Sequence, residues 1–325
     1  MTILPDIISS NARSGARQLP LIVALGLIAY AIYDGGYLVA VVGFGLIYTI
    51  FVGGLNIFMG HAGQTSFGQN GFAAIGAYAS AVLTTTQNWP PLLALLAGMV
   101  AAALLALVIG YPTLRLKGHY LAMATLAIGL IVYEIAVEWQ SVTNGYTGIS
   151  GIPPFSIGPY EISSDRGQLI FLSIVSVIML AASRLLRQSR FGRALVALSG
   201  SEDAARALGV NVARYKLAAF VISALYAALA GSLLVHIVGF VSPEMVGMNM
   251  VILAFTMLYV GGIGTTNGPL VGAMVVSLLP EVFRPLKDYQ DLVYGAALIL
   301  ILIYAPGGLA SLAAGGRARA HGEAR

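Results

Sequence analysis

The feature that most constrains the fold is an uncharged segment between Asp34 and Arg115, in which 80 consecutive residues include no Asp, Glu, Lys or Arg. A helix that crosses a bilayer needs roughly 20 apolar residues, so this segment alone has room for three crossings and their connections. Only 9% of the 325 residues are charged, whereas soluble domains carry about a quarter. The sequence therefore excludes a soluble globule and indicates one integral membrane domain.

The spans are predicted to be helices, because lipid cannot hydrogen-bond to open backbone groups and the apolar runs are continuous rather than alternating. We expect an all-α membrane protein, a polytopic bundle of about ten transmembrane helices within residues 18–310. The first four spans are predicted at 18–34, 37–58, 68–86 and 91–111, and later uncharged runs supply the others. Broken or short helices are expected near 60–71 and 261–272, where glycines interrupt the apolar pattern.

The first span has two interpretations. Arg13 and Arg17 followed by LIVALGLIAYA resemble the charged and apolar regions of a cleaved signal peptide. We favour a retained first helix, preceded by a cytoplasmic segment 1–17, because a polytopic protein can use its first helix for targeting.

The loops predict the orientation. The loop 184–216 contains seven basic and two acidic residues, whereas the loop 140–166 contains one basic and two acidic residues. Because basic loops stay on the cytoplasmic side, we expect 184–216 inside and 140–166 outside. Both the N-terminus and the tail 311–325 then lie inside. Membrane proximity also explains the net charge of +4 without nucleic-acid binding.

A polar patch lies inside the long uncharged segment. Its side chains alternate with glycines, and the candidate pathway residues are Gln64, Ser66, Gln69 and Asn70. Polar groups at membrane depth are costly unless they face a bundle interior or a water-filled path, and glycines break helices there. The patch is therefore predicted to be a bent segment that lines a passage. The alternative is a cytoplasmic turn with ordinary interhelical hydrogen bonds.

Few other residues suggest chemistry. Glu134 is a further pathway candidate because it lies deeper in its span than Glu138, for which we favour a place in the outer interface. The chain has four histidines without metal-site spacing and no cysteines. It also lacks a phosphate-binding GxxxxGK[ST] loop, so it is predicted to be neither an enzyme nor a nucleotide-binding protein.

A short helix is predicted within the loop 184–216. Ser201 is a suitable N-cap, acidic residues follow in the first turn, and Gly209 is a suitable stop. Because this helix is too short to have a core of its own, it must dock against a partner or lie on the membrane surface.

Long motifs in register resemble the LIV-type permeases, the membrane subunits of bacterial ABC importers for branched-chain amino acids. The segments that carry the resemblance are GLNIFMGHAGQTSFGQNGFAAIGAY, YLAMATLAIGLIVYEI, GYTGISGIPP, GRALVALSGSEDAARALGVNVARYKLAAFVISALYAALAG and YVGGIGTTNGPLVGA. The similarity is closest to the LivM-like branch and spans residues 35–310.

The resemblance implies an assembly in the bacterial inner membrane. It would contain this chain, a second LivH-like permease, two cytoplasmic ATPases that bind the ATP, and a periplasmic binding protein. The implied ATPase-coupling residues are Glu202, Asp203, Ala204, Ala205, Arg206 and Gly209. The implied contacts with the binding protein are Gly145, Gly148, Ile149, Gly151 and Pro153.

The resemblance leaves the solute open, since similar permeases serve urea, short amides and aromatic amino acids as well as branched-chain amino acids. An alternative of another class is an ion-coupled secondary transporter that uses Glu134 and needs no ATPase. The helix at 202–209 separates the two hypotheses, because only the importer requires it.

Overall fold

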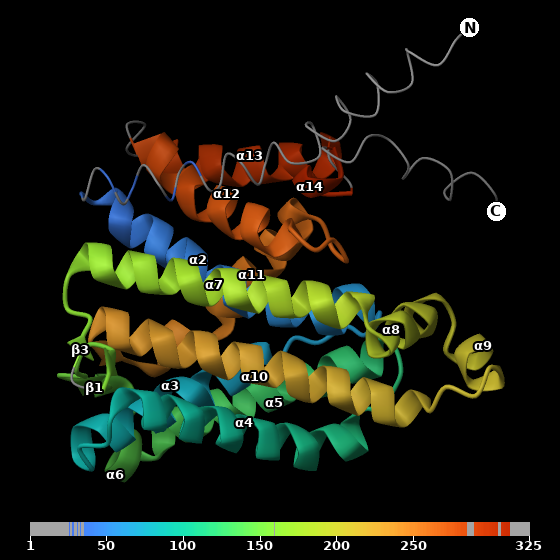
Figure 1. Ribbon diagram of the computed structural model, residues 1–325, viewed down its shortest axis with the longest axis horizontal. Coiled ribbons are helices and arrows are strands. Elements are labelled where there is room, and N and C mark those ends of the chain that lie inside the picture. The colour runs from blue at the N-terminus through green and yellow to red at the C-terminus, as the bar shows by residue number, and fades with distance from the viewer. Residues whose placement is uncertain are drawn as a thin grey trace, which may run out of the picture.

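The computed structural model describes residues 36–158, 160–284, 289–304 and 307–312, together with Gly26, Ile28, Ala31 and Tyr33. The predicted segment 1–17, nearly all of the predicted first span and most of the predicted tail 311–325 lie outside the described residues. The described part is a bundle of helices with two small antiparallel sheets at one end (Figure 1).

The first half of the bundle contains four long helices. They are α2 (Leu38–Leu55), which continues as the π-helix η1 (Asn56–His61), then α3 (Gln69–Thr86), α4 (Pro91–Thr113) and α5 (His119–Glu138). Short elements follow α5. They are α6 (Gln140–Thr143), η2 (Gly145–Thr147), β1 (Ile149–Ser150), β2 (Ser156–Ile157) and β3 (Tyr160–Glu161).

The second half contains elements of more varied length, including one short strand. They are α7 (Asp165–Gln188), α8 (Arg190–Gly200), α9 (Glu202–Ala207) and α10 (Val212–Val238), then β4 (Phe240–Val241), η3 (Pro243–Val246), α11 (Met248–Gly261), α12 (Gly268–Phe283), α13 (Gln290–Tyr304) and α14 (Leu309–Leu312). Within the described ranges, six helices are long and apolar enough to cross a membrane, and α12 is a shorter apolar helix. A polytopic all-α membrane fold is established, and the total of about ten spans stays a prediction.

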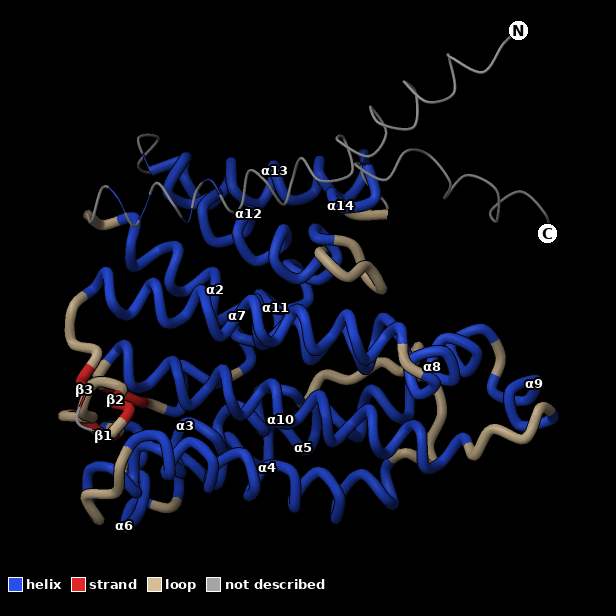
Figure 2. The backbone as a smooth tube through the Cα atoms, in the orientation of Figure 1, coloured by secondary structure: helices blue, strands red, loops and turns tan. Residues whose placement is uncertain are grey.

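The two ends of the bundle carry different structures (Figure 2). Helices α8 and α9 project from one end, and the strands with α6 lie at the other (Figure 1). There β1 pairs with β4, with Ile149 opposite Val241, and β2 pairs with β3. The loops 140–166 and 184–216 therefore lie at opposite ends, as the sequence predicts.

Helix α10 packs closely against α3 because small residues line the contact. A Cβ at Gly231 would lie 2.1 Å from the carbonyl oxygen of Ala73, and a Cβ at Gly76 would lie 2.2 Å from that of Ala228. Small residues allow such backbone contact between membrane helices. Ala73 and Ala228 at this crossing belong to the buried core.

The helices are interrupted at the two places that the sequence predicts. Residues 62–68 between η1 and α3, and residues 262–267 between α11 and α12, are not helical. The spacing of Gly264, Gly268 and Gly272 is that of a small-residue stripe on one helix, although Pro269 indicates that a helix begins there. Gly264 instead lies in the second break with φ of 74°, while Gly272 packs on α11, where a Cβ would lie 1.8 Å from the carbonyl oxygen of Met257.

Candidate functional site

The first helix break carries the chain alongside α5 before α3 begins. The backbone N–H of Phe67 donates to Thr125 Oγ1 over 3.0 Å, and a Cβ at Gly68 would lie 2.2 Å from the carbonyl oxygen of Thr125. Asn70, in the first turn of α3, lies against Gly129 of α5. Helix α3 therefore begins beside the middle of α5 rather than beside its end.

The buried side chain of Asn56 connects the two helix breaks. It donates to the carbonyl oxygen of Thr265 over 2.8 Å and accepts from the backbone N–H of Gly264 over 2.7 Å. Gly60 packs directly against Gly264. The sequence analysis did not select Asn56, although it is a polar residue within an apolar run just before the predicted break.

A cavity of about 450 Å³ opens beside the start of α3. It is lined by Asn70, Leu130, Tyr133, Glu244, Gly247, Met248 and Asn249. Asn70 is only 3% exposed, and its Nδ2 donates to the carbonyl oxygen of Val246 over 3.1 Å. Its Oδ1 has no hydrogen-bond partner among the described residues. The buried Asn70 thus contributes to the wall of a cavity that the acidic residue Glu244 also lines.

The predicted pathway residues do not all meet at this cavity. Only Asn70 lines it. Ser66 and Gln69 are buried nearby in the chain, and their side-chain polar atoms have no partner in the described part of the molecule. Glu134 is exposed and does not line the cavity, whereas its neighbour Tyr133 does.

Three polar lining residues were missed by the sequence analysis: Tyr133, Glu244 and Asn249. The signal for Glu244 was available, since it is the one charge between two long apolar runs. A carboxylate at such a place is costly in lipid and indicates a path.

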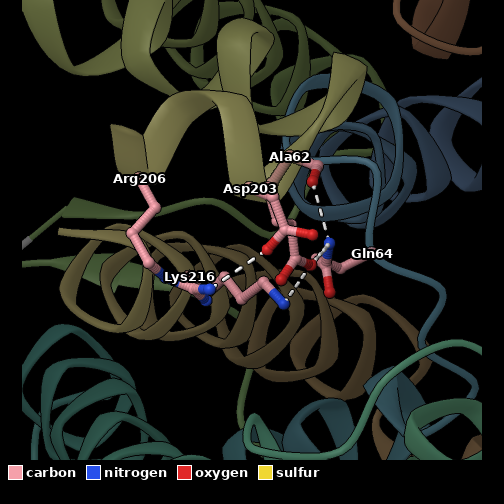
Figure 3. A network of polar contacts seen from close by, with 6 residues as sticks. Ala62, Gln64, Asp203, Arg206 and Lys216 are labelled. Atoms are coloured by element: carbon pink, nitrogen blue, oxygen red, sulfur yellow. Dashed lines mark hydrogen bonds and ion pairs between the residues drawn. The ribbon is translucent and has the colours of Figure 1, made fainter. Parts of the chain in front are cut away.

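Gln64 lies in a different environment, next to α9 (Figure 3). Its Nε2 donates to Glu202 Oε1 over 3.1 Å and to the carbonyl oxygen of Ala62 over 3.2 Å. The same carboxylate forms an ion pair with Lys216 of α10. The side chain of Lys216 is 3% exposed and that of Glu202 is 19% exposed. One carboxylate therefore joins α9, the first break and α10.

Helix α9 is bounded as the sequence predicts. The Ser201 hydroxyl accepts from the backbone N–H of Ala204 over 3.3 Å, and Gly209 follows the helix with φ of 84°. Of the predicted coupling residues, Glu202 and Ala205 face inward, whereas Asp203, Ala204, Arg206 and Gly209 are exposed. Leu208 directly follows α9 and was not predicted from the sequence. Its side chain is 83% exposed and adds an apolar group to this outer face.

The residues predicted to contact a binding protein lie at the opposite end of the bundle. Gly145, Gly148 and Ile149 are buried, Pro153 is partly buried and Gly151 is exposed. Gly148 must be glycine, because its φ is 71° and a Cβ would lie 2.2 Å from the carbonyl oxygen of Val241. Other side chains of this loop are more exposed. They are Tyr146, Ile157 and Tyr160.

A buried histidine anchors this loop to the bundle. His236 Nδ1 lies 2.8 Å from the carbonyl oxygen of Pro153, and its Nε2 lies 2.8 Å from Ser80 Oγ. Because a carbonyl oxygen only accepts, Nδ1 carries the proton and Nε2 accepts from the Ser80 hydroxyl. His236 thus ties the loop to α3 and α10.

The described residues contain no group of three or more His, Cys, Asp or Glu side chains placed to hold a metal ion. The site instead consists of interrupted apolar helices, a polar cavity at one break and a short helix, α9, that contacts the same break. Interrupted helices that present polar groups within a membrane bundle are typical of transporters. The fold and the site therefore define a polytopic membrane transport protein.

Comparison with known proteins gives the family. The family model for the permease component of branched-chain amino acid transport systems matches residues 37–302. The chain therefore belongs to this permease family. No solved structure matches the chain.

Individual relatives agree with this assignment. The high-affinity branched-chain amino acid transport permease LivM of Salmonella typhimurium is 33% identical over 94% of this chain and 77% of its own length. LivM of Escherichia coli is 35% identical over 81% of this chain and 68% of its own length. The permease LivH of Salmonella typhimurium is 27% identical over 82% of this chain and 91% of its own length.

Proposed function

We propose that this chain is the LivM-like permease subunit of a bacterial ABC importer for branched-chain amino acids. In the inner membrane it pairs with a LivH-like permease. Two cytoplasmic ATPases that bind the ATP and a periplasmic binding protein complete the importer. The family assignment and the LivM and LivH relatives support the pair of permeases. The ATPases and the binding protein are inferred from the resemblance of the sequence to importers of this type.

The end of the bundle that carries α8 and α9 faces the cytoplasm in this proposal. The excess of basic residues in 184–216 supports this orientation. The end with the strands then faces the binding protein. Its exposed aromatic residues Tyr146 and Tyr160 suit such a contact, because aromatic side chains are enriched in protein interfaces.

The observation that carries the proposed mechanism is the shared carboxylate of Glu202. Through it, α9 is joined to Gln64 of the first break and to Lys216 of α10. When the ATPases close and move α9, these contacts transmit the displacement to both segments. Packed segments respond to such a shift by changing between discrete arrangements, which switches the access of the passage.

The cavity at Asn70 is the proposed place where the passage holds its solute. The carboxylate of Glu244 is an acceptor that fits the ammonium group of an amino acid, and Asn70 adds a polar residue to the cavity wall. Leu130 and Met248 provide an apolar wall for the side chain. A neutral solute such as urea would make less use of the Glu244 charge, so the charge favours an amino acid.

Co-purification of ATPase subunits with the tagged chain tests the coupling surface. The chain is expressed with its partner permease, the ATPases and the binding protein, in native form and as Leu208→Glu. We expect the variant to lose the ATPases and the uptake of leucine, because it places a charge on the exposed apolar contact of α9.

Tyr160→Glu is the matched control, because Tyr160 is 79% exposed and lies at the opposite end of the bundle. It should retain the ATPases. Equal retention by both variants would contradict the proposed role of α9.

A further inference from the structure

A second cavity lies at the end of the bundle that carries α9. It has a volume of about 500 Å³ and lies between the end of α4, the connection to α5, α9 and the start of α10. Three exposed cations line it: Arg115, Lys117 and Arg206. It is separate from the cavity at Asn70. The proposed transport mechanism uses Glu202 and Lys216, which also line it, and assigns no role to Arg115 or Lys117.

Of the three exposed cations, Arg206 forms an ion pair with Asp203, whereas the charges of Arg115 and Lys117 are not neutralised by the described residues. Glu202 is the acidic residue that lines the cavity, and its carboxylate is engaged by Lys216. No carboxylate of the described residues forms an ion pair with Arg115 or Lys117. The Arg115 guanidinium lies 4.8 Å from the ring centroid of Tyr111, so it is held over the helix end.

The cavity also continues into an apolar surface of α4. Leu104, Leu107, Val108 and Tyr111 are exposed, and their spacing places them on one face of the helix. This stripe leads to Tyr111, which lines the cavity together with Leu114 and Leu217. Tyrosine is enriched at the boundary between membrane and water. The surface is therefore basic at the cavity and apolar along the adjoining helix.

We propose that this cavity binds an anionic phospholipid of the adjacent leaflet. Its phosphate lies between Arg115 and Lys117, and its acyl chains lie along the exposed stripe of α4. Basic pockets between membrane helices recognise anionic head groups in this way. The apolar stripe favours a lipid rather than an ATPase as the occupant of the cavity. Leu208, the exposed apolar residue that follows α9, does not line the cavity.

The inner leaflet follows from the proposed orientation, but the site itself does not depend on the transported solute. A lipid here would rest on Arg206 of α9 and beside the Lys216–Glu202 pair. It would therefore support the helix that couples to the ATPases.

Native mass spectrometry of the full-length chain in detergent tests the proposal. The chain is titrated with dioleoyl phosphatidylglycerol or with dioleoyl phosphatidylcholine, and the first bound lipid is counted. We expect tighter binding of phosphatidylglycerol. In Arg115→Gln/Lys117→Gln this first binding should weaken about tenfold, because each cation near a head group contributes a separate attraction.

The control Arg184→Gln/Arg190→Gln removes the same charge from exposed arginines near the same end of the bundle and should bind phosphatidylglycerol normally. Equal weakening in both double variants, or equal binding of the two lipids, would overturn the proposal. Displacement of the lipid by millimolar inorganic phosphate would also overturn it, because it would assign the site to a soluble anion.

Loss of the ATPases from Arg115→Gln/Lys117→Gln, with lipid binding unchanged, would assign the surface to a protein partner. Because lipid binding is measured without transport, the lipid proposal can fail while the permease proposal stands. The permease proposal can likewise fail while the lipid proposal stands.

Discussion

At the scale of single residues, Glu202 and Lys216 differ in solvent exposure, with 19% and 3% of their side chains exposed. Glu202→Gln leaves the ammonium buried and unpaired, so we expect a loss of stability of about 3 kcal/mol. Lys216→Met leaves a carboxylate that still reaches solvent and Gln64, so the loss should be about 1 kcal/mol.

Thermal unfolding in detergent measures this order. The double variant Glu202→Gln/Lys216→Met should be more stable than Glu202→Gln alone, since it removes the unpaired charge. Asp203→Asn is the control, because its ion pair with Arg206 is exposed and contributes less than about 1 kcal/mol. An Asp203→Asn effect as large as that of Glu202→Gln would contradict the argument.

Glu244 and Asn70 provide a second test at this scale. Glu244→Gln keeps the shape of an exposed side chain and removes the charge proposed to meet the ammonium group. We expect leucine uptake by the complete importer to fall at least tenfold, since a lost charged hydrogen bond costs about 1.5–3 kcal/mol. The ATPases should still co-purify.

Asn70→Leu should reduce uptake further, because it also removes the hydrogen bond to Val246. Glu134→Gln is the matched control, since Glu134 is an exposed carboxylate that does not line the cavity. If Glu134→Gln lowered uptake and Glu244→Gln did not, the passage would follow a different face of α5.

At the scale of elements, the crossing of α3 and α10 depends on glycines that allow backbone contact. Gly231→Ala would place a methyl group 2.1 Å from the carbonyl oxygen of Ala73. We expect a destabilisation of about 1–3 kcal/mol from overpacking, visible as a lower midpoint of thermal unfolding.

Gly200→Ala in α8 is the matched control, because a Cβ there meets nothing within 4 Å. Alanine is the better helix former, so this variant should be neutral or slightly stabilising. Equal destabilisation of the two variants would show that the close backbone contact is not the cause of the lower stability.

At the scale of the whole molecule, the orientation can be measured directly because the chain has no cysteine. Leu208→Cys and Tyr160→Cys introduce single thiols at residues that are 83% and 79% exposed, at opposite ends of the bundle. A membrane-impermeant maleimide should label Cys at 160 after the outer membrane is opened.

Cys at 208 should react only after the inner membrane is also permeabilised. The reverse pattern would invert the proposed orientation, and labelling of both thiols from one side would contradict the opposite placement of the two loops.

Much of the helical architecture could be predicted from the sequence. The expected spans 68–86 and 91–111 correspond to the helices α3 and α4, because the glycine-rich break, the connection 87–90 and Arg115 bound them. Of these two helices, α4 is among the six that are long and apolar enough to cross a membrane. The two breaks and the limits of α9 were also predicted, since glycines and the Ser201 cap act on their own neighbours.

The contacts of the site could not be predicted in the same way. Gln64 was expected in the passage, and the structure places it against Glu202, which is 138 residues away in the chain. Asn56 meets Gly264 across 208 residues, and the cavity receives Tyr133 and Glu244 rather than Glu134.

The sequence by itself therefore determined that the chain is a helical membrane protein, where its helices break and where the short helix α9 lies. Those properties depend on local hydropathy, capping and backbone freedom. Only the tertiary structure decided which polar residues meet. The reason is that helical periodicity gives the face of a residue, whereas its neighbour depends on how the helices cross, and backbone contacts such as Gly231 with Ala73 set that crossing.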